Sequence, residues 1–109
     1  MVIVLIRRCV RREKEKEFLA SYVSEEPKNP DFIDEWLTKV DSSDSLPEPM
    51  RSFEVGCNAD CVTYINVAMW RSANAFRAHF NPKTTHDTIF ECADRHRAVL
   101  AIQEVVSTS

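Results

Sequence analysis

The sequence predicts an α+β fold in which helices cover one face of a four-stranded, mostly antiparallel sheet, the split βαβ or ferredoxin-like arrangement. Three observations lead to this prediction. Residues 2–11 are typical of a buried strand, residues 61–70 form a second apolar strand that runs directly into a helix, and the order of elements gives two βαβ halves. A chain of 109 residues is expected to form a single domain, residues 1–109, with an extra helix and loop at about 30–49.

The first half of the chain supplies a strand and a helix. Residues 2–11 begin with an apolar run that covers both faces of the strand, as expected for a strand buried on both sides of its sheet. Residues 12–24 are rich in Glu and Lys but keep an apolar stripe that includes Phe18 and Tyr22, which predicts an amphipathic helix. Pro27 and Pro30 interrupt the pattern, because proline removes a helix donor.

The middle of the chain is predicted to hold a short helix, a loop and a hairpin. Apolar residues recur at helical spacing over residues 31–40, and the polar, proline-containing residues 41–49 indicate a loop. Residues 50–57 are expected to pair with residues 61–70 as a β-hairpin, with residues 58–60 as the turn.

The last part of the chain is predicted to repeat the helix and strand order. Ser72 is a candidate N-cap for a helix that continues through Phe80. Thr84 or Thr85 is expected to cap a further helix that runs to about His96, and residues 97–107 return to strand character.

The apolar character of the predicted strands also indicates how the chain assembles. Both faces of residues 61–70 are largely apolar, and helices can cover only one of them. An exposed sheet of this kind would be an unusually large apolar patch for a monomer. We therefore expect a homodimer in which two sheets pack together.

Composition narrows the class of protein. The chain has 44% hydrophobic and 28% charged residues with a net charge of −3, which does not favour nucleic acid or a membrane surface as a partner. No apolar run is long enough to span a bilayer, and we expect a cytoplasmic protein. Its four cysteines (Cys9, Cys57, Cys61 and Cys92) are therefore expected to be reduced thiols, and no metal site is expected.

A motif at the join of strand and helix resembles a known family. The sequence Tyr64-x-Asn66-x-x-x-Trp70-x-Ser72, followed by Phe76 and Phe80, is similar to the signature of the antibiotic-biosynthesis monooxygenase domain, a dimeric α+β barrel. The likeness is greatest to the monooxygenases of the actinorhodin pathway, which also have a Glu-Trp pair upstream, here Glu35-Trp36. The resemblance covers the element order of most of the chain, but its specific part spans about twenty residues.

The resemblance implies a monooxygenase that needs no cofactor and oxidises a quinol or polyphenolic aromatic with O₂. It places the family's strand Asn and Trp on Asn66 and Trp70. The family's helix tyrosine falls on Phe76, which lacks a hydroxyl group. Arg95 and Arg97 are candidates for the family's pocket arginine.

The residues themselves suggest how such a site would work. Asn66 is a polar side chain on an apolar strand face, and a buried amide must be hydrogen-bonded to structure or to a ligand. His79 and His96 are candidate bases, because histidine exchanges protons near neutral pH. The predicted catalytic residues are Asn66, Trp70 and His79. The predicted substrate-binding residues are Tyr64, Phe76, Phe80 and His96.

The sequence also allows other interpretations of these residues and of the function. Asn66 can be a core residue bonded to backbone, and Trp70 can be simply the large core residue at the join. The alternatives to the monooxygenase are a non-catalytic dimer that binds a small molecule, including a stress-related barrel, and a non-oxidative isomerase on the same fold. A core filled by Phe76 and Phe80 beside Asn66 would favour the non-catalytic dimer.

Overall fold

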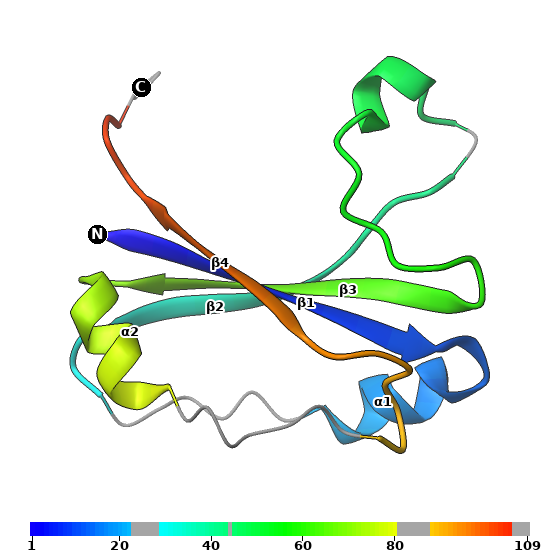
Figure 1. The fold of residues 1–109 in the computed structure, drawn as a ribbon, viewed down its shortest axis with the longest axis horizontal. Helices are drawn as coiled ribbons and strands as arrows, with labels where there is room; N and C mark the ends of the chain where they lie inside the picture. The colour runs from blue at the N-terminus through cyan, green and yellow to red at the C-terminus, as the bar shows by residue number, and fades with distance from the viewer. Residues whose placement is uncertain (23–28, 44, 81–87, 106–109) are drawn as a thin grey trace.

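A computed structural model describes residues 1–22, 29–43, 45–80 and 88–105. They form a four-stranded antiparallel sheet with the strand order β2-β3-β1-β4, and two helices cover one of its faces (Figure 1). The strands are β1 (Val2–Arg11), β2 (Phe32–Lys39), β3 (Cys61–Trp70) and β4 (His96–Ala101); the α-helices are α1 (Glu15–Ser21) and α2 (Ala73–His79), and 3₁₀ turns occupy η1 (Arg12–Lys14) and η2 (Glu48–Arg51). The α+β class and the antiparallel four-stranded sheet are as predicted, and the strand order is consistent with a ferredoxin-like fold.

The central pair of strands carries the core. β1 and β3 pair along their whole lengths, from Val2 opposite Trp70 to Arg11 opposite Cys61. Side chains that face the helices form two buried clusters, one around Val4 and Trp70 and the other around Val10 and Phe18. The predicted strands at residues 2–11 and 61–70 are both confirmed.

Both predicted helices next to these strands are present. η1 and α1 occupy residues 12–21, and Phe18 turns inward between the aromatic rings of Tyr22, Tyr64 and Phe90. α2 begins after Ser72, whose side-chain oxygen accepts a hydrogen bond from the Ala75 backbone N–H at 3.1 Å. Ser72 is therefore the predicted N-cap.

The short helix predicted over residues 31–40 is wrong, because this segment is the edge strand β2. Its pairing with β3 shifts by one residue between Phe32, opposite Trp70, and Asp34, opposite Met69. Ile33 is the extra residue of this β-bulge. The bulge changes the phase of the alternation, so that Phe32 and Leu37 face the helices although they are five residues apart. Trp36 is on the opposite face, so the helical pattern in the sequence came from apolar residues on both faces of one strand.

The predicted hairpin between residues 50–57 and 61–70 is also wrong. β1 and β2 occupy both edges of β3, so no edge is left for a hairpin partner. Residues 41–43 and 45–60 instead form an arm that contains η2 and rises on the side of the sheet away from the helices (Figure 1).

The C-terminal part differs from the prediction in where the last strand begins. β4 starts at His96, so the predicted helix does not extend to this residue, and residues 88–95 are not helical. The proposed caps Thr84 and Thr85 lie outside the described residues. The strand predicted at residues 97–107 is confirmed as far as Ala101.

The expectation of reduced thiols is wrong, because the four cysteines form two disulfides. Cys9 pairs with Cys57 and Cys61 pairs with Cys92. The first bond ties the arm to β1, and the second ties the segment before β4 to β3. Disulfides are typical of oxidising compartments, so cysteine usage no longer argues for a cytoplasmic location. Within the described part of the chain, no helix has the length and apolar character needed to cross a membrane.

The sheet face away from the helices is apolar and partly open. Ile3, Leu5, Val67 and Met69 are half-buried at its centre. Trp36, on the same face of β2, is 48% exposed.

The disulfides can be tested by counting thiols. Denatured protein purified without reductant is expected to label at none of its cysteines with a maleimide, and at all four after reduction. Replacing Cys9 and Cys57 together by Ala is expected to lower the free energy of unfolding by about 2–4 kcal/mol, because the bond closes a long loop of the unfolded chain. Four reactive thiols in unreduced protein would contradict the pairing.

Candidate active site

A cavity of about 350 Å³ lies between the helix-covered face of the sheet and the two helices. Its volume is at the small end of the range for ligand pockets, which suits a compact ligand of one or two rings. The cavity has an aromatic end beside α2 and a charged end beside α1. Its lining comprises Ile6, Arg8, Phe18, Ser21, Tyr22, Phe32, Glu35, Ala68, Trp70, Phe76, His79, Phe90, Glu91 and Arg95.

Trp70 forms the centre of the aromatic end. The residue is only 2% exposed, and its ring centroid lies 5.4 Å from that of Phe32, 5.8 Å from that of Phe76 and 5.3 Å from that of His79. The contacts with Phe32 and Phe76 are edge-on, the arrangement that the quadrupoles of aromatic rings favour. Rings held by neighbours on three sides give this end of the cavity a fixed shape.

Asn66 lies behind the wall of the cavity. The residue is fully buried, and its Nδ2 donates hydrogen bonds to the Tyr22 hydroxyl at 2.7 Å and to Glu35 Oε1 at 3.3 Å. Its Oδ1 has no hydrogen-bond partner among the described residues. Because Tyr22 and Glu35 line the cavity and Asn66 does not, Asn66 is a positioning residue that fixes both of these side chains.

Glu35 is placed in the cavity by the bulge at Ile33. After the bulge, Glu35 stands opposite Ala68 on the helix side, whereas Asp34 and Trp36 face the other way. Burial raises the pKa of the Glu35 carboxyl, although the positive charge of Arg8, the hydrogen bond from Asn66 and the charge of His79 act in the opposite direction. A carboxylate with a raised pKa is a stronger proton acceptor than an ordinary glutamate.

Tyr22 is a neutral neighbour of this carboxylate. Burial, and then the negative charge of Glu35, raise the pKa of its phenol. Its hydroxyl therefore keeps its proton at neutral pH.

Arg8 brings a positive charge to the other side of the cavity. Its guanidinium lies 5.7 Å from the centre of the Tyr22 ring, and its buried Nε has no hydrogen-bond partner among the described residues. Burial, and then the positive charge of Arg95, lower the pKa of Arg8. Arg95 itself is held by both oxygens of Glu91, at 3.0 and 2.7 Å, and Glu91 is only 1% exposed.

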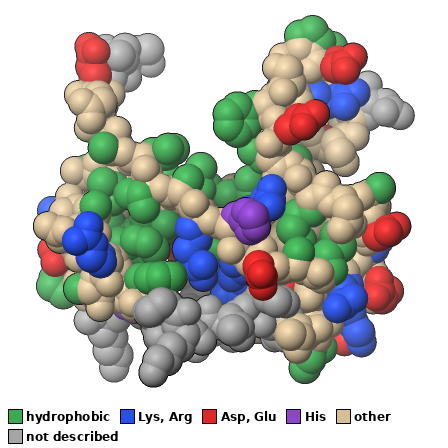
Figure 2. Space-filling model, in the orientation of Figure 1, with side chains coloured by type: hydrophobic (Ala, Val, Ile, Leu, Met, Phe, Trp, Pro, Cys, Tyr) green, Lys and Arg blue, Asp and Glu red, His purple; other side chains and the backbone are tan. Residues whose placement is uncertain are grey.

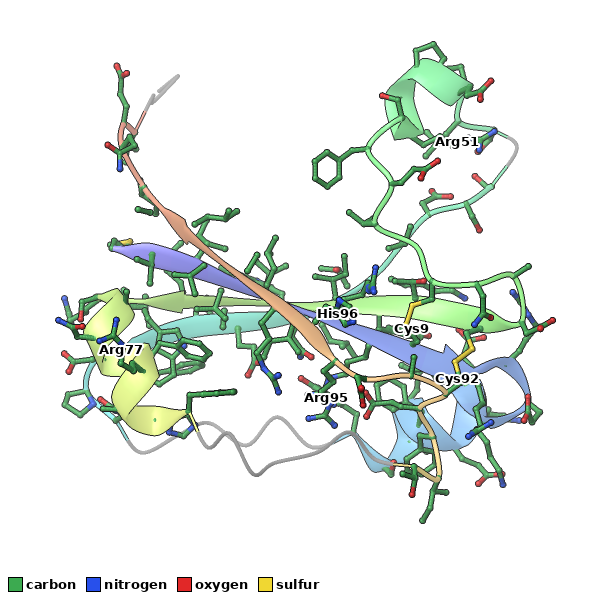
Figure 3. The ribbon with its side chains drawn as sticks, in the orientation of Figure 1. Cys9, Arg51, Arg77, Cys92, Arg95 and His96 are labelled. Carbon is green, nitrogen blue, oxygen red and sulfur yellow. A yellow bond between two sulfur atoms is a disulfide. The ribbon has the colours of Figure 1, made fainter. Side chains whose placement is uncertain are left out.

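The figures show how these charges lie in the fold. Arg95 points toward the helix side of the sheet, whereas the neighbouring His96 projects from the other side (Figure 3). Basic side chains gather at the centre of the visible surface, next to a larger group of hydrophobic side chains (Figure 2).

The predicted site residues are only partly brought together. Trp70, Phe76 and His79 line the cavity, and Asn66 supports it from behind. Arg95 also lines the cavity, whereas Arg97 does not.

Three predicted substrate-binding residues lie away from the cavity. Tyr64 donates a hydrogen bond to Glu15 at 2.6 Å in the cluster around Phe18. Phe80 is 37% exposed and packs under the guanidinium of Arg97, 4.9 Å from its ring centre. His96 is exposed on the face of the sheet away from the helices, where it stands opposite Arg7 of the neighbouring strand. It therefore cannot serve as a base in the cavity.

Five charged or polar lining residues were not predicted as site residues from the sequence: Arg8, Ser21, Tyr22, Glu35 and Glu91. Arg8 carried a usable signal, since it interrupts an inward-facing apolar series between Ile6 and Val10. Glu35 could not be placed, because its segment was read as a helix. Glu91 lies in an isolated bridge to Val10, which no short-range pattern predicts.

No family model matches the chain, and no curated protein matches it. Within the described residues, no group of three or more His, Cys, Asp or Glu side chains is arranged to hold a metal ion.

Proposed function

We propose that this protein is a monooxygenase that needs no cofactor and oxidises a quinol or polyphenolic aromatic with O₂. The observation that carries the proposal is the position of Glu35, a carboxylate of raised pKa that shares one cavity with the aromatic group around Trp70. The resemblance of the motif from Tyr64 to Ser72 to the antibiotic-biosynthesis monooxygenase domain supports the same reaction class.

Glu35 is the proposed general base. It is fixed by the hydrogen bond from Asn66 and lies in the cavity rather than on the surface. His79 lies in the same cavity, in contact with Trp70, and is a second group through which a proton can pass.

The proposed reaction is balanced without a flavin or a metal, because the substrate supplies the electrons. For a substrate with an acidic CH₂ group, as in an anthrone, Glu35 removes one proton and leaves a carbanion whose charge spreads over the ring system. The carbanion gives one electron to O₂, and the resulting radical pair combines to form a C–O bond. The peroxide takes up a proton. Glu35 then removes the second proton from the same carbon, the O–O bond breaks, and a ketone and water are formed.

The protein contributes positioning and charge. The rings around Trp70 hold a flat substrate against Glu35, and Arg8 adds a positive charge to the same cavity.

A non-oxidative isomerase is a second candidate, and the same pair of groups favours it. A base and a cation that face one cavity are sufficient to move a proton between carbon atoms of a ketone or enol. Turnover of such a substrate under argon would assign the cavity to this reaction.

Oxygen uptake tests the monooxygenase directly. With a panel of hydroquinones, naphthalenediols and anthrones, at least one substrate is expected to consume O₂ above its rate of autoxidation. Glu35→Gln is expected to lower kcat by about 100- to 10,000-fold, because general-base catalysis is lost. The uptake rate of the wild type should rise with pH through the raised pKa of Glu35, since the base acts in its ionised form.

Asp34→Asn is the matched control for Glu35→Gln. Asp34 is the adjacent carboxylate in β2, it is exposed, and it faces away from the cavity. This variant should keep the uptake rate of the wild type. Uptake that equals autoxidation for every substrate would contradict the monooxygenase.

We also propose that the chain works as a homodimer through the apolar face of its sheet. The half-buried residues around Val67, together with the exposed Trp36, supply a face that a second copy of the same sheet would cover.

Sedimentation equilibrium at micromolar concentration is expected to give twice the mass of one chain. Val67→Lys should give the mass of one chain, because it places a charge at the centre of the face. Asn74→Lys, on the exposed side of α2, should remain a dimer. A wild-type protein with the mass of a single chain would contradict the proposal.

A further inference from the structure

The two arginines that line the cavity, Arg8 and Arg95, differ in whether they have a carboxylate partner. Arg95 is matched by Glu91 through two short hydrogen bonds. Arg8 has no carboxylate within ion-pair distance among the described residues, and its buried Nε lacks an acceptor. A guanidinium whose buried Nε has no acceptor gains most from a planar anion that accepts two hydrogen bonds.

The sheet register fixes where this cation lies relative to the rest of the cavity. Arg8 stands opposite Tyr64 in β1, and Trp70 is six residues further along β3, so their backbones are about 20 Å apart along the strand. Ile6 and the small Ala68 lie between them and line the cavity. The floor is therefore long and apolar, with an aromatic group at one end and a cation at the other.

Glu35 lies between the two ends. It stands opposite Ala68, four residues from the position opposite Arg8, so the two backbones are about 13 Å apart along the strands and about 10 Å apart across them. Both side chains line the cavity, and each charge affects the pKa of the other group. A ligand that places an anion on Arg8 therefore also presents a carbon atom to the base.

We propose that the cavity takes an aromatic acid, with its ring system against Trp70 and Phe76 and its carboxylate on Arg8. This inference rests on the proposed function, since it names the substrate class of the same cavity. The oxidisable position of such a substrate lies at the end of the ring system remote from the carboxylate, beside Glu35. A carboxylate matches a guanidinium through two parallel hydrogen bonds, which a neutral phenol or amide cannot reproduce.

The test is calorimetric titration of the whole protein under argon with 6-hydroxy-2-naphthoate and with the matched neutral amide, 6-hydroxy-2-naphthamide. The wild type is expected to bind the acid about 10- to 100-fold more tightly than the amide, because a hydrogen bond to a charged group contributes more than a neutral one. Arg8→Gln should reduce this ratio to less than about threefold, and Arg8→Lys should retain part of it.

Arg7→Gln is the matched control, because Arg7 is the next residue of the same strand and faces the other side of the sheet. It should leave the ratio unchanged. Equal affinities of the acid and the amide for the wild type would overturn the inference without the use of any variant. A preference that survives in Arg8→Gln and is lost in Arg95→Gln would also overturn it, since the anion would then bind at Arg95.

Binding and turnover separate this inference from the proposed function. A preference for the acid that depends on Arg8, without oxygen uptake, would support the binding inference while the monooxygenase fails. Oxygen uptake by an enzyme that binds acid and amide equally would overturn the aromatic acid and leave the monooxygenase in place.

Discussion

The bulge at Ile33 is the constraint on which the candidate site depends. A regular strand from Phe32 onward would point Asp34 and Trp36 at the helices and turn Glu35 outward. The extra residue reverses this phase, so that a carboxylate enters the cavity and a tryptophan remains on the open face of the sheet. One irregular position in an edge strand thus supplies both the proposed base and part of the proposed dimer surface.

The site concentrates buried polar groups in one layer of a small domain. Asn66, Tyr22 and Glu35 form one hydrogen-bonded group, and Glu91 with Arg95 forms another. Burying such groups lowers stability unless each is paired, and among the described residues three buried side-chain atoms have no hydrogen-bond partner: Asn66 Oδ1 and Arg8 Nε on the helix side of the sheet, and Arg7 Nε on the open side. The two on the helix side lie at the candidate site, where a bound ligand would supply a partner.

Sequence patterns predicted the elements whose structure depends on neighbouring residues. They failed for the features that contacts between distant parts of the chain determine. The central strands and the helix capped by Ser72 follow from local periodicity, and all were found. The edge strand was predicted as a helix because apolar residues on both of its faces, Phe32 and Leu37 on one and Trp36 on the other, recur together at helical spacing. The disulfides of Cys9 and Cys61 join segments that lie far apart in the chain, and composition alone favoured reduced thiols. Trp70, which the motif singled out, lines the cavity, whereas Glu35 and Arg8 can be placed there only from the register of the sheet.

The proposed function depends on Glu35 as a half-buried carboxylate that accepts a proton, and this can be tested by titrating Glu35 itself. The side-chain carboxyl carbon of Glu35 can be followed by ¹³C NMR against pH and assigned by its absence in Glu35→Gln. The expected midpoint lies above the ordinary range of an exposed glutamate, because burial raises the pKa of Glu35 more than Arg8, Asn66 and His79 lower it. A midpoint within the ordinary range would mean that Glu35 is fully solvated, and would contradict its assignment as the base in the cavity.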